Sequence, residues 1–253
     1  YLLDVQPDLG IFNSVYNQKR TLECGGQSIK NMNARVIYNF FDSNDYYQPP
    51  KRPILRNLFS IADDVTVFLV IGNINPGKGH LDLIQSIHKM KLDNLLDKDK
   101  IKFMIVGEDV TGSGLGEKIM EQVEDLGLNK LIIFAGFQDD NAAAYAGADW
   151  VVIPSSEEPF GRVAVEAILA RKPVVARNNS GLSEILSDLN TPILTNDDTV
   201  IALTKAIHKA LNTNIDQTLL LEDAEKVALR FSKENQFDML LNEVYFNLAP
   251  IKQ

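Results

Sequence analysis

Two glycines and a lysine within the stretch VIGNINPGKGH, residues 70–80, have the spacing of a phosphate-binding loop. Gly72, Gly77 and Lys78 fit the pattern G-x-x-x-x-G-K, in which glycines let the backbone approach a phosphate and the lysine neutralises its charge. A nucleoside triphosphatase also needs Ser or Thr after this lysine to hold Mg²⁺, but Gly79 stands there. The stretch therefore predicts an anion cradle rather than a triphosphatase loop. A tight turn with a solvated lysine is the alternative.

Two glutamates separated by seven residues form a second candidate group. Glu158 lies in a loop after an apolar run, and Glu166 lies about a turn and a half into the helix predicted to follow. In a parallel α/β sheet this loop and the first free N–H groups of the helix lie at the carboxyl edge, where anionic ligands bind. Sugar and ribose hydroxyls are suitable partners for the two carboxylates, while the helix end and Lys78 take phosphates. Two solvated charges at a helix end are the alternative.

A third stretch, GEDVTGSGLG at 107–116, also follows a predicted strand and contains alternating glycines. Its spacing is not G-x-G-x-x-G, and no acidic residue that would hold a ribose is evident on the next strand. We therefore expect a flexible surface loop rather than a dinucleotide site.

Charge and composition exclude several classes of protein. The net charge of -9 argues against a nucleic-acid partner, because such proteins normally carry a basic patch. The longest apolar run, 65–71, is too short to span a bilayer. The chain opens on Tyr1 without a signal-peptide pattern, and we expect it to be a piece of a longer, cytoplasmic protein.

Cysteine and histidine usage argues against disulfides and metal sites. The single cysteine, Cys24, excludes an internal disulfide framework, and we expect a buried or half-buried thiol. His80, His88 and His208 are scattered, and no carboxylate or cysteine cluster has ligand spacing. We therefore predict no bound metal, and we expect His80 to begin the helix that follows the cradle.

Short runs rich in Val and Ile alternate with longer helical patterns, which is typical of a parallel α/β sheet covered on both faces. Six strands in doubly wound order would form one Rossmann-like unit of about 190 residues. The expected strands are 65–71, 101–106, 131–134, 150–153, 173–176 and 193–194. The expected helices are 80–90, 115–126, 140–148, 161–170, 181–188, 197–212, 217–231 and 234–248.

The first 60 residues do not follow this rhythm. Residues 8–23 are predicted to form a strand that leads into a helix, and residues 34–41 a further strand. A polar, proline-bearing connector at 42–53 then favours a domain boundary. We place the two parts at residues 1–45 and 46–253.

Several motifs in register resemble the retaining glycosyltransferases of family four, which have the GT-B fold. Their signature P-S-x-x-E-P-F-G-x-x-x-x-E-A matches residues 154–167, and it continues through KPVVA into SGLSEIL, which is similar to the family's G-G-x-P-E-I segment. Upstream, IGNINPGKGH is similar to G-R-L-x-x-x-K-G, and FMIVGED to h-x-I-V-G-x-G. The resemblance covers roughly residues 35–250, with the motifs in the family's order.

The resemblance implies that the chain is the C-terminal half of a GT-B fold with a short remnant of the N-terminal domain. Residues 1–45 would be the tail of the acceptor-binding domain plus the crossover, and 46–253 the nucleotide-sugar-binding domain. Because the reaction takes place between two domains, the chain alone is expected to be inactive or weakly active. In the family, the terminal helix at 234–248 packs back on the first domain; packing within its own domain is the alternative.

The resemblance also implies roles for the matched residues. Lys78 would neutralise the donor's diphosphate, helped by backbone amides near Phe160 and Gly161. Glu158 would hold hydroxyls of the transferred sugar, and Glu166 would accept a hydrogen bond from the ribose. The implied catalytic residues are Glu158 and Lys78. The implied donor-binding residues are Gly72, Asn73, Lys78, Gly136, Phe137, Glu158, Phe160, Gly161, Arg162 and Glu166.

Three further expectations concern Asn73, the place of the nucleobase and Glu184. The family usually has Arg where Asn73 stands, which weakens donor binding unless Arg162 or another side chain substitutes. The nucleobase would lie against backbone near Gly136 and Phe137. Glu184 is expected to cap a short helix, with a role in function as the alternative.

The implied reaction transfers a sugar from a nucleotide-diphosphate sugar to an acceptor with retention of configuration and without a metal or other cofactor. A UDP-sugar is favoured as donor over a GDP-sugar, and the acceptor is a saccharide, a lipid-linked sugar or a protein. The missing N-terminal domain is the expected partner, and it would allow contact with the inner face of the membrane in the full-length protein. A nucleotide-sugar epimerase and a non-catalytic nucleotide-sugar-binding protein are the alternatives.

Overall fold

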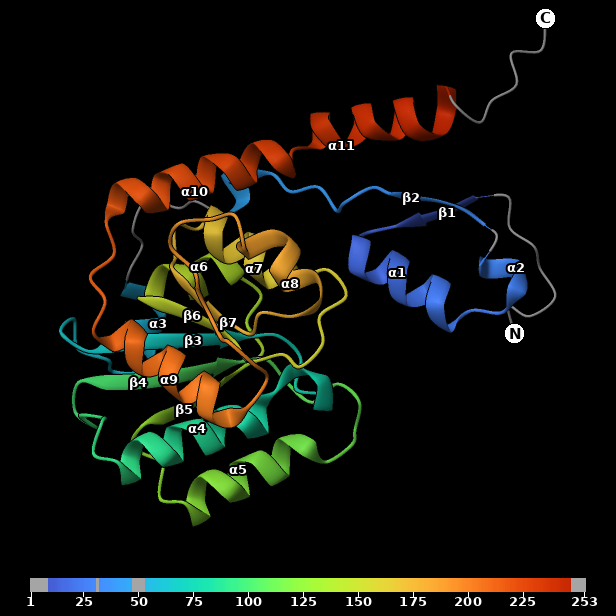
Figure 1. The fold of residues 1–253 in the computed structure, drawn as a ribbon. Helices are drawn as coiled ribbons and strands as arrows, with labels where there is room; N and C mark the ends of the chain where they lie inside the picture. The colour runs from blue at the N-terminus through green and yellow to red at the C-terminus, as the bar shows by residue number, and fades with distance from the viewer. Residues whose placement is uncertain (1–8, 31, 47–52, 247–253) are drawn as a thin grey trace, which may run out of the picture.

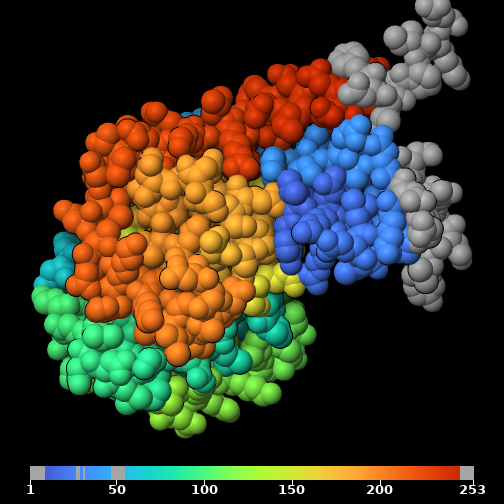
Figure 2. All heavy atoms as spheres, in the orientation of Figure 1, coloured from blue at the N-terminus to red at the C-terminus, as the bar shows by residue number. Residues whose placement is uncertain are grey.

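The computed structural model describes residues 9–30, 32–46 and 53–246 (Figure 1). Within them, a small N-terminal unit lies beside a larger α/β body. The N-terminal unit is a parallel pair of strands, β1 (Leu9–Phe12) and β2 (Asn33–Val36), joined by helices α1 (Val15–Cys24) and α2 (Gln27–Lys30). In Figure 2 it forms a lobe on the side of the body.

The larger body is built on a six-stranded parallel sheet with the order β5-β4-β3-β6-β7-β8. Along the chain this is the doubly wound order 3-2-1-4-5-6, so the predicted Rossmann-like sheet is confirmed. The order reverses between β3 and β6, and ligands of such sheets bind at the carboxyl ends of the strands at this switch point. The strands are β3 (Thr66–Ile71), β4 (Ile101–Val106), β5 (Ile132–Gly136), β6 (Trp150–Ile153), β7 (Val174–Ala176) and β8 (Ile193–Leu194).

Helices cover both faces of this sheet and make a three-layered body. Helices α4, α5 and α9 bury their apolar side chains on one face, and α3, α6, α7, α8 and α10 on the other. Their bounds are α3 (Pro53–Leu58), α4 (His80–Leu92), α5 (Leu115–Asp125), α6 (Asn141–Gly147), α7 (Arg162–Leu169), α8 (Ser180–Leu186), α9 (Val200–Leu211) and α10 (Gln217–Arg230).

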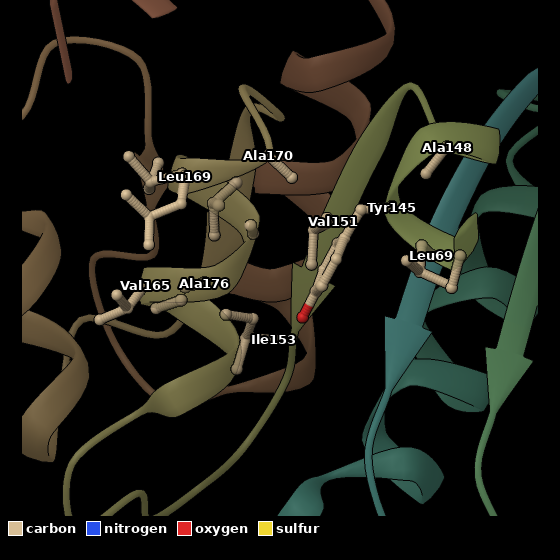
Figure 3. Close-up of a cluster of buried hydrophobic side chains, with 14 of the residues drawn as sticks. Leu69, Tyr145, Ala148, Val151, Ile153, Val165, Leu169, Ala170 and Ala176 are labelled. Carbon is tan, nitrogen blue, oxygen red and sulfur yellow. The ribbon is translucent and has the colours of Figure 1, made fainter. Parts of the chain in front are cut away.

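Alternate residues of each strand enter opposite cores, which explains the continuous apolar runs in the sequence. In β6, Val151 and Ile153 join one core, while Trp150 and Val152 join the other. Figure 3 shows part of the first of these cores, where the β6 side chains lie between helix α7 on one side and Tyr145 of α6 with Leu69 of β3 on the other. Both cores are built from apolar side chains, so burying a polar group there is costly unless it has hydrogen-bond partners.

All predicted strands of the main sheet are present, with ends shifted by at most two residues. The eight predicted helices are also present, and His80 begins α4 as expected. Short elements were missed, because three to six residues carry too little periodicity: α2, α3 and the single turns Ser43–Asp45 and Pro76–Lys78. Part of the predicted connector, residues 47–52, lies outside the described residues. The division at residue 45 stays a prediction.

The single cysteine corrects one expectation. Cys24 is exposed at the last position of α1, whereas the sequence suggested a buried or half-buried thiol. The reason is that α1 buries no residue fully, because it lies on a small two-stranded unit without a deep core.

Glu184 of α8 joins the two parts of the molecule. Its carboxylate accepts hydrogen bonds from the backbone N–H of Val15, at 3.0 Å, and from that of Tyr16, the first two residues of α1. It also accepts from the hydroxyl of Tyr38, at 3.3 Å. The capping role expected for Glu184 is therefore exerted on α1 of the N-terminal unit, where a carboxylate also meets the positive end of the helix dipole.

The end of the chain lies along the N-terminal unit. Helix α11 (Lys233–Leu240) and the π-helical turn Leu241–Phe246 extend past the body, above β1 and β2 in Figure 1. The Gln236 side chain accepts from the backbone N–H of Tyr38 at 2.9 Å, and Arg35 pairs with Glu243 at 3.2 Å. Of the two alternatives for this helix, packing against the N-terminal segment is thus the observed one.

Two features are absent from the described part of the chain. None of its helices combines the length and apolar character needed to cross a membrane. No three His, Cys, Asp or Glu side chains there lie close enough together to hold a metal ion.

Arg56 holds α3 against the main α/β body through buried hydrogen bonds. Its guanidinium is 1% exposed and donates to the carbonyls of Gly147 and Val65, each at 2.9 Å, and to the Asp149 carboxylate at 2.6 Å. The same carboxylate accepts from the backbone N–H of Val67, so one ion pair ties α3 to the start of β3.

We expect Arg56→Met to lower the free energy of unfolding by about 3 kcal/mol, because it leaves buried acceptors without their donor. Lys89→Met is the control, since Lys89 forms an exposed pair with Asp93 and its loss changes stability by less than about 1 kcal/mol. Urea unfolding measures both variants. Equal effects would contradict the anchoring role of Arg56.

Candidate functional site

A cleft of about 490 Å³ lies at the carboxyl ends of β3 and β6, where the strand order reverses. This is the size of a small-molecule site and the location expected for one in a doubly wound sheet. It is lined by Asn13, Asn39, Ile71, Gly72, Asn73, Asn75, Lys78, Val106, Gly107, Phe137, Gln138, Asn141, Glu158, Pro159, Phe160, Gly161, Arg162, Val163 and Glu166.

The loop after β3 reaches the loop after β6 through a very close backbone approach. Gly79 has φ +70°, and a Cβ atom there would lie 2.0 Å from the carbonyl oxygen of Pro154. Only glycine permits both this conformation and this contact. The backbone N–H of Ser156 also donates to the Gly77 carbonyl at 3.1 Å. These contacts set the position of Lys78 relative to the loop that carries Glu158.

Lys78 and Glu158 form an ion pair across the two loops. The Lys78 Nζ lies 2.7 Å from a carboxylate oxygen of Glu158, and the side chains are only 28% and 12% exposed. The backbone N–H of Glu158 donates to the Ser180 hydroxyl at 2.9 Å, which fixes the loop against α8. A cation for phosphate and a carboxylate for hydroxyls therefore stand side by side at the switch point.

Glu166 lies one helical turn inside α7 and is 5% exposed. It accepts a hydrogen bond from the Tyr145 hydroxyl at 3.0 Å, and Arg162 lies 3.4 Å from its other oxygen. Burial raises the pKa of Glu166, although the Tyr145 hydrogen bond and Arg162 oppose this change. Burial also raises the pKa of Tyr145 well above its ordinary value, so its hydroxyl stays protonated and donates.

The charges that line the cleft are balanced. Its two cationic side chains, Lys78 and Arg162, are each paired with a carboxylate, and the N-terminal end of α7 adds backbone N–H groups beside Gly161. A ligand that fits this arrangement carries negative charge and hydroxyl groups together. A bare anion would meet two carboxylates as well as two cations.

Nine of the ten predicted donor-binding residues line this one cleft. Gly136 is not among them; it ends β5 with φ +64°, and the next residue, Phe137, reaches the cleft with 61% of its surface exposed. The Phe137 N–H faces the Glu108 carboxylate at 3.4 Å. The sequence therefore located the pocket, while the individual roles stay predictions.

Sequence reasoning missed the amide side chains that line the cleft. Asn75, Gln138 and Asn141 follow the predicted strands closely, and their place at the carboxyl edge was a usable signal. Asn13 and Asn39 come from the N-terminal segment, and no local pattern connects them to the site. The Ser14 hydroxyl donates to the carbonyl of Pro159, which brings this segment against the loop of Glu158.

We expect Gly79→Ala to lower the free energy of unfolding by at least about 2 kcal/mol, because Ala is strained at positive φ and its Cβ meets a backbone oxygen. Gly77→Ala, two residues away, is the matched control, since the nearest atom to its Cβ is 3.6 Å away. Thermal and urea unfolding compare the two. If Gly77→Ala cost as much, the close approach at Gly79 would not be the constraint.

Comparisons with known proteins agree with this geometry. A family model for glycosyl transferases group 1 matches residues 51–227, which is more than half of the chain. A lipopolysaccharide 1,2-N-acetylglucosaminetransferase of Salmonella typhimurium is 33% identical over 160 residues, covering 60% of this chain and 40% of that protein. A D-inositol 3-phosphate glycosyltransferase of Geodermatophilus obscurus is 30% identical over 203 residues, covering 78% of this chain and 44% of that protein. The chain thus spans less than half the length of these two relatives.

Solved structures give the same result for the fold. The Anabaena protein HepE in complex with UDP and glucose has a TM-score of 0.80 and 26% identity, with 94% of this chain and 63% of that chain covered. A sucrose-phosphate synthase of Thermosynechococcus elongatus has a TM-score of 0.77 at 23% identity, with 96% of this chain and 59% of that chain covered. The fold is that of the GT-B glycosyltransferases, and the chain belongs to the group 1 glycosyltransferases.

Proposed function

We propose that this chain is the donor-binding half of a retaining glycosyltransferase that uses a UDP-sugar. The observation that carries the proposal is the Lys78–Glu158 ion pair, which stands at the switch point of a group 1 glycosyltransferase fold. One partner suits the diphosphate of such a donor, and the other suits the hydroxyls of its sugar. The buried Glu166 adds a third polar group on the same wall of the cleft.

The donor lies along the cleft from Phe137 to Glu158 in this proposal. The ribose hydroxyls donate to Glu166, whose geometry is fixed by Tyr145. The diphosphate lies between Lys78 and the first N–H groups of α7, where the helix dipole favours negative charge. The base rests against the exposed ring and backbone of Phe137. Arg162, which is 60% exposed, supplies the second cation that Asn73 does not provide.

Catalysis in this proposal is electrostatic. As the bond between the sugar and the diphosphate breaks, negative charge grows on the leaving phosphate beside Lys78 and the start of α7, and groups fixed in advance stabilise it without reorganising. Glu158 holds the sugar by its hydroxyls while the acceptor attacks with retention. We expect this reaction to need no metal or other cofactor.

The choice of UDP rests on similarity. HepE, at 26–27% identity, is bound to UDP and glucose in one structure and to UDP-glucose in another. The acceptor approaches from the side of Asn13 and Asn39, and a domain beyond this chain completes its site. The acceptor class (saccharide, lipid-linked sugar or protein) and the cytoplasmic location stay predictions.

Thermal unfolding with UDP, GDP and ADP and their glucose conjugates tests the proposal. At ten times the dissociation constant a ligand adds about 1.4 kcal/mol, or roughly 3 to 5 °C for a chain of this size. We expect this shift with UDP and UDP-glucose and its loss in Lys78→Met. Lys89→Met, which removes a cation far from the cleft, should shift like the wild type. A chain that responds to none of the nucleotides would contradict the proposed donor site.

Replacing Glu166 by Gln should weaken donor binding without lowering the stability of the fold. Because its pKa is raised in the folded state, the folded chain holds this proton more tightly, so stability falls as pH rises from about 4.5 through the folded pKa. Above the folded pKa, the ionised, buried carboxylate therefore lowers stability. We expect Glu166→Gln to unfold at the same or a higher temperature, while UDP binds about tenfold more weakly.

Glu121→Gln, on the exposed face of α5, is the control for this experiment and should change neither property. Calorimetry at pH 5, 6 and 7 measures the unfolding temperature, and titration calorimetry measures UDP affinity. If Glu166→Gln bound UDP as the wild type does, Glu166 would not be the ribose acceptor.

A further inference from the structure

His80 is buried directly behind the Lys78–Glu158 ion pair. It is the second residue after Lys78, it opens α4, and only 3% of its surface is exposed. Neither of its ring nitrogens has a hydrogen-bond partner among the described residues. A buried imidazole without partners is costly, so this position calls for an explanation beyond packing.

The charge state of this imidazole follows from its surroundings. Burial, together with the smaller effect of the nearby Lys78, lowers the pKa of His80 to about 4. At neutral pH the ring is therefore uncharged, with one nitrogen that donates and one that accepts. Asp82, the acidic residue nearest to His80 on α4, forms an ion pair with Arg177, which directly follows β7.

A small hollow is lined by His80 and by both residues of the ion pair. Its volume is about 10 Å³, and its lining includes His80, Lys78, Glu158, Ser155 and Gly72. One water molecule needs about this volume together with two to four polar partners. Four of its lining residues have polar side chains, namely His80, Lys78, Glu158 and Ser155, the last of which is 2% exposed; most of the others are apolar.

We propose that this hollow binds a single water molecule that links the imidazole of His80 to the Lys78–Glu158 pair. His80 then acts as a positioning residue, which holds the ammonium group and the carboxylate in the orientation that receives a nucleotide-sugar. Support for this link comes from the hollow and from the two ring nitrogens of His80, which have no hydrogen-bond partner in the part of the chain that the structure describes. Its effect on donor binding rests on the function proposed above.

A double-mutant cycle in ligand-free protein tests the link. The variants are His80→Leu, Lys78→Met and the combination, and urea unfolding gives their folding equilibrium constants. We expect the two changes to be non-additive by at least about threefold, because they remove two partners of the same water. His80→Gln, which keeps a donor and an acceptor, should preserve most of the coupling with Lys78. Additive effects, or coupling that Gln does not preserve, would overturn the proposal.

A second measurement tests the consequence for donor binding. We expect His80→Leu to unfold at the same or a higher temperature than the wild type, since an apolar side chain replaces a buried polar one. UDP and UDP-glucose should nevertheless bind it about tenfold more weakly, and His80→Gln should recover most of that affinity. Unchanged affinity in His80→Leu would overturn the positioning role.

The two measurements separate this inference from the proposed function. If the cycle shows coupling but the wild type binds neither UDP nor UDP-glucose, the water link stands and the donor assignment fails. If the wild type binds UDP-glucose and the cycle shows no coupling, the donor assignment stands and the link fails.

Discussion

The contact between Gly79 and the carbonyl of Pro154 is the constraint on which the site depends. Parallel strands bring the loops after β3 and β6 to one edge of the sheet. A side chain at residue 79 would collide with the carbonyl of Pro154, so glycine there lets the loops approach closely enough for Lys78 and Glu158 to meet. The position of the Lys78–Glu158 pair therefore depends on this backbone approach.

The sheet was predictable because its strands are buried on both faces, so that each one is a short apolar run between helical patterns. The pocket was predictable because the doubly wound order sends the loops of Gly72, Lys78 and Glu158 to the same edge. The contributions of Asn13 and Asn39 were not predictable, since they depend on how the N-terminal unit docks. Glu184 fixes that docking across 169 and 168 positions of sequence, and no local pattern reports a contact at that separation.

The cleft also shows how polar groups are kept within an apolar fold. Glu166 is buried, and its partners are a tyrosine from α6 and an arginine from its own helix, so its position is fixed before any ligand arrives. Tyr145 in turn lies in the core beside Val151 and Leu69 (Figure 3). The site is thus continuous with the core, and a change in core packing near α6 reaches the end of the cleft that holds Glu166.

Cys24 is a natural attachment site for a spectroscopic label. It is the chain's one cysteine, it is exposed, and it ends the helix whose first residues are held by Glu184. A fluorophore or spin label attached there reports on the N-terminal unit, and α1 contributes no residue to the lining of the cleft. Spectroscopy on a singly labelled chain can therefore follow this unit relative to the six-stranded sheet, with no engineered cysteine.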